Sequence, residues 1–207
     1  MIEIIERTDD YVVCIKPIGI SSQDDGMGKL LSQQLGCRVF CVHRLDTAVS
    51  GLMVYALSGR SANALSASLG NKEYLAVVEN TELAESGIFE DLLFHDSRSN
   101  KTYPVKRMRK GVRKARLSYK KLESADGLSL LKVMLDTGRT HQIRVQFATR
   151  KMPLLGDGKY GSRHNGNIAL YSCHLSFRDP STNETREFTS WPNGQPWERF
   201  SVIRGNR

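Results

Sequence analysis

The feature that most constrains the fold of this chain is a series of short apolar segments, each four to eight residues long. Segments of this length, bounded by polar residues, glycine or proline, are typical of buried strands. None approaches the roughly 20 apolar residues that a membrane-spanning helix needs. The segments that we expect to form strands are residues 2–5, 11–15, 38–42, 51–57, 73–78, 117–122 and 128–135, with two more on either side of a turn at residues 179–183.

Helical spacing occurs in only three places, at residues 28–35, 61–69 and 140–150. Strands and helices therefore mix without a regular β-α-β order. This pattern predicts an α+β fold with a mixed, largely antiparallel sheet flanked by helices and loops. The 207 residues, 40% of them hydrophobic, can bury a real core, and we expect a single domain over residues 1–207.

The net charge of +8 and the isoelectric point of about 9.4 favour polyanionic partners. Basic residues are concentrated between residues 101 and 116, where Pro104 and Gly111 favour a loop or hairpin. The cations of this stretch are Lys101, Lys106, Arg107, Arg109, Lys110, Arg113, Lys114 and Arg116. We expect phosphate contacts here, chiefly from Arg107, Arg109 and Lys110.

Several other classes of site have no pattern in this sequence. There is no glycine-rich phosphate loop and no histidine-rich or acidic metal cluster, so we expect neither a nucleotide cofactor nor a metal. Cys37 and Cys41 are spaced to share a helix face, but all four cysteines are expected to be buried free thiols. With no export signal either, the sequence predicts a soluble cytoplasmic protein without membrane contact.

Two polar clusters could carry chemistry. Residues 43–46 (HRLD) precede an apolar strand. Asp46 and Arg44 could form a catalytic pair or an ordinary surface ion pair, and the spacing alone favours the surface ion pair. Residues 138–144 (GRTHQIR) could bind an anion at a helix start. There Gly138 would allow an unusual backbone angle and Thr140 would cap the helix. A capped helix with a solvated polar face explains the second cluster equally well.

Two further segments have simpler explanations. Tyr74, at the start of a predicted strand, could stack on a base, but a half-buried strand tyrosine is the more common case. Residues 152–161 (MPLLGDGKYG) are explained as a tight structural turn by their proline and glycines.

Taken in order, these segments resemble the RluA family of RNA pseudouridine synthases over about 170 residues. The family's first strand and Lys-Pro-x-Gly turn resemble DDYVVCIKPIGI, and its signature HRLD-x-x-T-S-G resembles HRLDTAVSG. Its active-site tyrosine strand resembles KEYLAVV, its two later motifs resemble GRTHQIRVQ and MPLLGDGKYG, and its late strand resembles LYSCHLSFRDP. Departures from the family pattern occur at Val49, Gln146 and Asp179.

The resemblance implies a pseudouridine synthase-like catalytic fold and a role for each matching residue. Asp46 would be the essential acid on a flipped-out uridine, Arg144 would pair with it and keep it ionised, and Tyr74 would stack on the base. Arg44 would fill the space that the uridine leaves in the RNA stack. The remaining residues of the second cluster would contact RNA, and these are Arg139, His141 and Gln142.

The expected activity is therefore isomerisation of uridine to pseudouridine in structured ribosomal or transfer RNA, without cofactor or metal, by a monomer. The chain would lack the small RNA-binding domain that often precedes this catalytic domain. Two alternatives stay open: a catalytically silent RNA-binding protein of the same fold, and a nuclease or phosphoryl-transfer enzyme, which would normally need a metal cluster.

Overall fold

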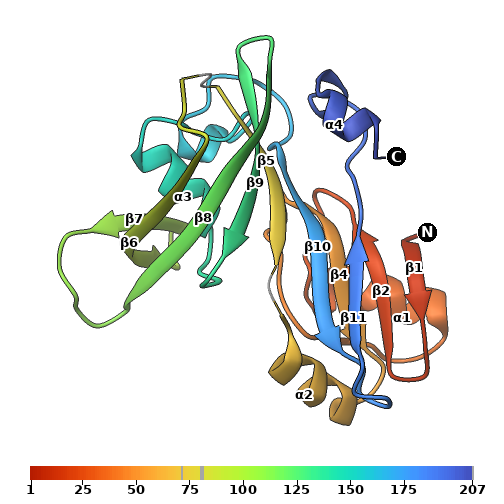
Figure 1. The fold of residues 1–207 in the computed structure, drawn as a ribbon. Coiled ribbons are helices and arrows are strands. Elements are labelled where there is room, and N and C mark those ends of the chain that lie inside the picture. The colour runs from red at the N-terminus through yellow and green to blue at the C-terminus, as the bar shows by residue number, and fades with distance from the viewer. Residues whose placement is uncertain (71, 80–81, 207) are drawn as a thin grey trace. The chain divides into compact units, whose positions relative to one another are not determined.

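The computed structural model describes residues 1–70, 72–79 and 82–206 (Figure 1). The chain divides into two compact units. The first unit comprises Met1–Lys72 and Tyr171–Pro192, and the second comprises Glu73–Leu170 and Asn193–Arg207. Each unit has its own part of a β-sheet and is described by itself below.

The first unit is built on strands whose neighbours are mostly antiparallel. Their order is β1 (Glu3–Arg7), β2 (Tyr11–Lys16), β4 (Ser50–Ala56), β10 (Leu170–Arg178) and β11 (Thr185–Thr189), with the short β3 (Phe40–Cys41) also on β4. The β4–β10 pair is parallel, and Tyr171 lies opposite Ser50. This pair needs glycine at position 51, where φ is +120° and an added Cβ would lie 2.3 Å from the Ser172 carbonyl oxygen.

Alternating residues of these strands form the core of the first unit. The members are Tyr11, Val13, Leu52, Val54, Ala56, Leu65, Leu175 and Phe177. Leu65 comes from helix α2 (Gly59–Ser68), which begins at Ser58, whose hydroxyl accepts a hydrogen bond from the Ser61 N–H at 3.0 Å. Helix α1 (Lys29–Leu35) follows a short helical turn, η1 (Asp24–Gly28), and ends at Gly36 in the left-handed conformation.

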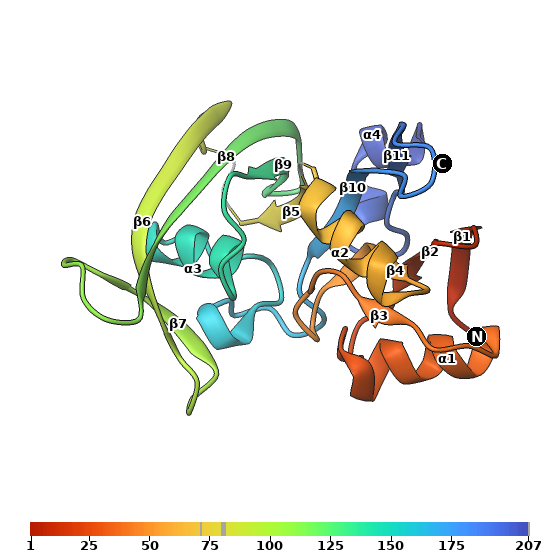
Figure 2. The same cartoon turned by 90° about the horizontal axis from the view of Figure 1, so that it is seen from below.

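The second unit contains an entirely antiparallel series of strands. Their order is β5 (Glu73–Val78), β9 (Leu128–Leu135), β8 (Val112–Ala125), β6 (Ser86–Asp96) and β7 (Lys101–Val105). A two-residue turn joins β8 to β9, and both Asp126 and Gly127 have positive φ, as such a hairpin requires. Helix α3 (Gln142–Thr149) packs against β6 and β7 (Figure 2).

The core of the second unit combines aliphatic and aromatic side chains. The rings of Phe89, Tyr119 and Phe147 meet with centroids 5.0 to 5.7 Å apart. Two short helices, η3 (Trp197–Arg199) and α4 (Ser201–Arg204), follow near the end of the chain. Both carboxylate oxygens of Glu123 accept hydrogen bonds at the start of α4, from the N–H groups of Ser201 and Val202 and from the Ser201 hydroxyl.

The predicted α+β fold with a largely antiparallel sheet is confirmed. The predicted strands at residues 11–15, 73–78 and 128–135 match β2, β5 and β9 within one residue. Strand β6 was missed because Glu90 and Asp91 interrupt its apolar residues, which therefore form neither a continuous apolar run nor a regular alternation. Residues 101–116, expected as a loop or hairpin, form β7, a loop and the start of β8; the two strands do not make a hairpin, since each pairs with β6 and not with the other.

Two smaller expectations also need comment. Cys37 and Cys41 do not share a helix face, because α1 ends before Cys37 and Cys41 lies in β3; all four cysteines are free, but only Cys14 and Cys173 are buried. Across the residues that the structure describes, every helix is too short or too polar to cross a bilayer.

Candidate active site

Asp46 lies in the loop between β3 and β4, where the sequence places it at the end of the HRLD segment. Its side chain is partly exposed, whereas the flanking residues Leu45 and Val49 are buried. The Val49 N–H donates to the Asp46 carbonyl oxygen at 2.9 Å and closes a turn. The valine that departs from the family pattern therefore fills the core behind this loop.

The residue before Asp46 is held by a serine that the sequence analysis did not single out. The Ser22 hydroxyl donates to the Leu45 carbonyl oxygen at 2.9 Å and accepts from the Leu45 N–H at 3.3 Å. Ser22 is itself held, because the Tyr55 hydroxyl donates to its carbonyl oxygen at 2.7 Å. Burial raises the pKa of Tyr55, so this phenol stays a donor.

The residue after Asp46 is held by a buried lysine. Lys16 is fully buried at the end of β2, and its Nζ donates to the carbonyl oxygens of Pro17, Ile20 and Thr47 at 2.8 to 3.3 Å. The Thr47 carbonyl also accepts from the Gly19 N–H. Burial lowers the pKa of Lys16 to about 8, and the nearby Asp46 carboxylate acts in the opposite direction. Both chain neighbours of Asp46 are thus anchored.

His43 is a buried, neutral histidine at the start of the same loop. Its Nε2 accepts from the Val54 N–H at 3.2 Å, which leaves the proton on Nδ1. Among the described residues Nδ1 has no hydrogen-bond partner. Burial, with a smaller contribution from the positive charge of Lys72, lowers the pKa of His43 to about 3.

Arg144 is buried in α3 and forms a bidentate ion pair with Asp157. Its Nε and Nη2 each donate to one Asp157 oxygen at 2.8 Å, and both side chains are almost fully buried. The guanidinium also lies 5.1 Å from the centre of the Tyr160 ring. The segment expected to be only a structural turn therefore supplies two side chains that orient Arg144.

The start of α3 differs from the expectation. Its first flanking residue is His141, in the left-handed conformation with φ of +55°, and no side chain caps the helix. Thr140 was therefore wrongly predicted as the cap; its carbonyl instead accepts from the Thr102 hydroxyl at 2.8 Å. Gly138 was expected to adopt the unusual backbone angle, but that angle falls on His141.

Tyr160 connects the start of α3 to β7. Its hydroxyl lies 2.9 Å from His141 Nδ1, accepts from the Thr102 N–H at 2.8 Å and donates to the Thr102 carbonyl at 3.3 Å. Burial raises the pKa of Tyr160, so its proton remains available for these bonds. His141 is consequently buried against Tyr160.

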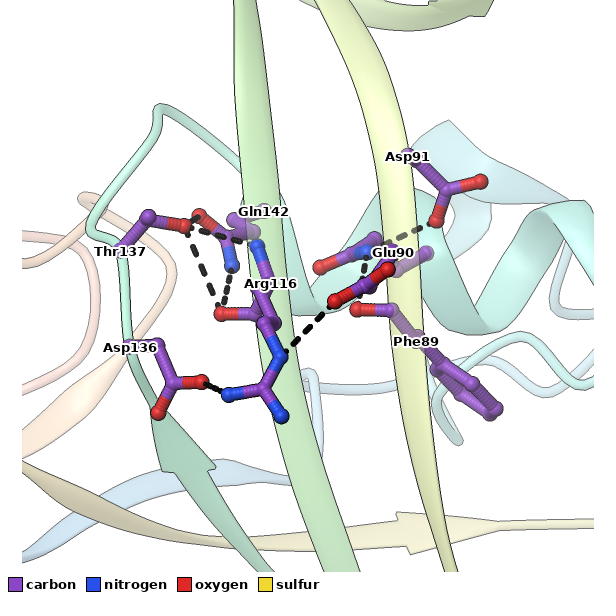
Figure 3. A network of polar contacts seen from close by, with 8 residues as sticks. Phe89, Glu90, Asp91, Arg116, Asp136, Thr137 and Gln142 are labelled. Carbon is purple, nitrogen blue, oxygen red and sulfur yellow. Dashed lines mark hydrogen bonds and ion pairs between the residues drawn. The ribbon is translucent and has the colours of Figure 1, made fainter.

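Gln142 is also buried, and its amide holds the loop before α3 (Figure 3). The amide oxygen accepts from the Thr137 hydroxyl and the Arg139 N–H, and the amide nitrogen donates to the Arg116 carbonyl. The Arg139 side chain remains exposed, with its Nε donating to the Lys114 carbonyl at 3.1 Å. Gln142 thus fixes the backbone from which Arg139 projects.

The remaining predicted site residues occupy two kinds of environment. Tyr74 is 6% exposed at the start of β5, opposite Val133 of β9. Arg44, Arg107, Arg109 and Lys110 are exposed. The structure brings Arg139, His141, Gln142 and Arg144 together around one helix start. Asp46 and Arg44 belong to the first unit, and the other predicted site residues belong to the second.

The other two departures from the family pattern lie outside these clusters. Gln146 is fully buried, and its amide nitrogen donates to the Phe89 carbonyl at 3.2 Å and to the Asp91 carboxylate at 2.7 Å. Asp179 forms the turn between β10 and β11, where its carboxylate accepts from the N–H groups of Ser181 and Thr182. Both residues stabilise local structure.

Sequence reasoning missed Lys16, Ser22, Asp157 and Tyr160. A signal existed for Lys16, because a lysine that follows a fully apolar strand and precedes proline is an unusual place for a solvated charge. Asp157 and Tyr160 lie in the segment at residues 152–161, whose proline and glycines were sufficient to explain it as a tight turn. Among the described residues, no group of three or more histidine, cysteine or acidic side chains is arranged to hold a metal.

Comparison with known proteins shows which family the chain resembles. The family model described as RNA pseudouridylate synthase matches residues 10–149. An uncharacterized RNA pseudouridine synthase of Haemophilus influenzae is 30% identical over 98% of this chain and 93% of its own length. A ribosomal large subunit pseudouridine synthase D of Neisseria meningitidis is 30% identical over 98% of this chain and 61% of its own length. The uncharacterized RNA pseudouridine synthase YlyB of Bacillus subtilis is 35% identical over 71% of this chain and 50% of its own length.

Solved structures show the same fold. Human RNA pseudouridylate synthase domain containing 1 aligns over 93% of this chain and 84% of its own with a TM-score of 0.79 at 21% identity. Human RNA pseudouridylate synthase domain containing 4 aligns over 95% of this chain and 90% of its own, with a TM-score of 0.76 at 19% identity. The predicted resemblance to RluA-type enzymes is confirmed, and the chain belongs to the RNA pseudouridylate synthase family of isomerases.

Proposed function

We propose that this chain converts a specific uridine of structured ribosomal or transfer RNA to pseudouridine, with Asp46 as the essential acid acting on a flipped-out nucleotide. The observation that carries the proposal is the anchoring of both neighbours of Asp46, Leu45 by Ser22 and Thr47 by Lys16. A catalytic carboxylate must be held in position before substrate arrives, and hydrogen bonds to the buried residues Ser22 and Lys16, one on each side, achieve this.

The other roles follow from the family motifs and from each residue's surroundings. Arg144 would pair with Asp46 and keep it ionised, and Asp157 and Tyr160 support this role because they fix the guanidinium in one orientation. Tyr74 would stack on the uracil and take the proton from its carbon. We propose that residues 1–207 act together as one catalytic domain.

RNA binding would involve two groups of side chains. Arg44, which is exposed, would fill the gap left by the flipped uridine, since flipping costs a few kcal/mol of stacking. Arg139 and the exposed Arg107, Arg109 and Lys110 would contact phosphates. His141 and Gln142 would contribute by holding the backbone around Arg139, because both are buried.

The isomerisation breaks the bond from the sugar to uracil nitrogen and makes one to carbon, and the base loses a proton from that carbon and gains one on nitrogen. No net redox change occurs, so the proposed reaction needs no cofactor. We propose that the enzyme acts as a monomer in the cytoplasm, where ribosomal and transfer RNA are found.

The test is to map pseudouridines in ribosomal and transfer RNA from cells that lack this chain, and then from the same cells supplied with wild type or Asp46→Asn. The proposal requires at least one site that disappears and returns only with the wild-type chain. Purified protein should form pseudouridine equally with and without a chelator. A complete set of pseudouridines in the deleted cells, with no product in vitro, would indicate a silent RNA-binding protein.

A further inference from the structure

The basic side chains of the second unit fall into two classes. The first class is neutralised within the unit; Figure 3 shows Arg116 paired with both Glu90 and Asp136. Lys121, Lys132 and Arg150 are paired in the same way with Glu85, Glu73 and Asp91. The second class forms no ion pair with any residue in the described ranges. On β7 and in the loop that follows it, the members of this class are Lys101, Lys106, Arg107, Arg109 and Lys110.

An exposed aromatic side chain lies among these unpaired cations. Tyr103 of β7 is opposite Phe94 of β6, and Phe94 is opposite Val112 of β8. Residues directly opposite one another in an antiparallel sheet point to the same face. The neighbouring residue Thr102 points to the other face, where it is buried against Tyr160. Tyr103 is therefore directed away from that buried network, and 40% of it is exposed.

Two of the cations lie over the rings of this face. Lys101 Nζ is 5.8 Å from the centre of the Tyr103 ring, and Arg109 Cζ is 5.2 Å from the centre of the Phe94 ring. The loop after β7 folds closely onto Phe94, because Gly111 has φ of +84° and an added Cβ would lie 3.3 Å from that ring. Arg109 is thus held beside Phe94, whereas Lys101 lies near both Tyr103 and Tyr160, with its Nζ 5.4 Å from the centre of the Tyr160 ring.

We propose that Tyr103, flanked by Lys101 and Arg109, is a stacking platform for one unpaired base of the RNA substrate, separate from the residues proposed to act on the target uridine. This inference rests on the proposed function only in taking RNA as the substrate. A π-face available for stacking, with unpaired cations beside it for the adjoining phosphates, is the combination that binds single-stranded nucleic acid. An acidic protein would find the same cations but would not need the exposed ring.

The experiment measures binding of a short single-stranded oligouridylate to the full chain by fluorescence anisotropy. Tyr103→Ala should weaken binding by about tenfold, and Tyr103→Phe should bind as wild type because the ring is kept. The matched control is Ile88→Ala, which removes a 58% exposed apolar side chain on the same face of β6. This control should leave binding unchanged.

An RNA strand made of abasic nucleotides separates stacking from charge. Wild type and Tyr103→Ala should bind this strand equally, because it has phosphates and no bases. Equal binding of oligouridylate by wild type and Tyr103→Ala would overturn the platform, as would an equal loss in Ile88→Ala. Pseudouridine formation is measured in parallel: loss of the Tyr103 effect with normal turnover refutes only the platform, and absent turnover with the effect intact refutes only the proposed function.

Discussion

Two loops of this molecule carry polar residues, and they are built in opposite ways. In the loop at residues 43–49, Leu45 and Thr47 are fixed by the buried groups Ser22 and Lys16. In the loop at residues 106–111, the cations are exposed and have no acidic partner among the described residues. The first arrangement gives positional precision to one side chain, whereas the second leaves charge available for an external polyanion.

The largest expected effect is that of a substitution at Asp46, in the anchored loop. Asp46→Asn should abolish pseudouridine formation, because the amide is nearly isosteric but has no charge, while affinity for RNA should stay within roughly tenfold of wild type. Single-turnover product formation and a binding titration on the same RNA measure the two effects. Normal turnover by this variant would show that the anchored loop does not carry the chemistry.

A second prediction concerns buried against exposed arginine. Arg144→Ala leaves Asp157 as an unpaired buried carboxylate, so the free energy of unfolding should fall by about 3–5 kcal/mol. Arg44 is exposed, so Arg44→Ala should melt like wild type. It should react slowly on folded RNA and recover part of that loss on a short unstructured RNA, where less stacking must be replaced.

Melting curves of the two arginine variants, together with single-turnover rates on folded and unstructured RNA, check this difference. Similar destabilisation of both variants, or an equal rate defect of Arg44→Ala on both RNAs, would show that the two arginines do not have distinct roles.

The third prediction concerns the pH dependence of stability that His43, at the start of the anchored loop, should produce. The pKa of His43 in the folded chain, about 3, lies below that of an unfolded histidine, about 6.5. The unfolded state therefore binds a proton that the folded state does not, and stability is lost as pH falls from about 6.5 towards 3. At pH 5 this loss is about 2 kcal/mol.

Substituting His43→Gln, which can still accept from the Val54 N–H, should remove that loss. Urea unfolding at pH 7 and pH 5 gives the comparison. An identical pH dependence in the variant and the wild type would mean that His43 is not held neutral by the fold.

The smallest effect is expected in the exposed loop. Neutralising Arg107, Arg109 and Lys110 to glutamine should weaken binding to all RNAs similarly and reduce the salt dependence by up to three contacts, each contributing a slope of about 0.7 to 0.9. Arg116→Gln is the control, because its charge is already balanced by Glu90 and Asp136. Affinity titrations at several salt concentrations decide; an unchanged slope in the triple variant would make the loop an ordinary solvated surface.

The sequence predicted best those strands whose apolar residues form an almost uninterrupted run. Strands β2, β5 and β9 have near-continuous apolar runs, and the structure places them within one residue of expectation. Strand β6 could not be found because Glu90 and Asp91 divide its apolar residues into two short groups without regular alternation. The extent of β8 was underestimated, since its first residues after Gly111 alternate buried and charged side chains only irregularly.

The motifs named candidate residues such as Asp46 and Arg144, whereas residues that support another residue from a distance were missed. The partnership of Arg144 with Asp157 spans 13 residues and that of Lys16 with Thr47 spans 31. No local period reports such contacts, because they depend on the tertiary path of the chain. Thr140 was an error of the opposite kind, in which a local signal was trusted but not used by the fold. Threonine is a good capping residue, but the residue that flanks the helix start is His141, one position later, and no side chain caps the helix.

The division of the chain has a consequence for its synthesis. The first unit is interrupted, because Glu73–Leu170 separates Met1–Lys72 from the Tyr171–Pro192 segment that completes its sheet. A ribosome adds roughly 5–20 residues each second, so β4 waits several seconds for its parallel neighbour β10. During that interval the edge of β4 at Ser50 and Gly51, where β10 will pair, has unsatisfied backbone groups, which is the condition under which strands pair with other chains. A nascent chain arrested before residue 171 should therefore be the species that most needs a chaperone.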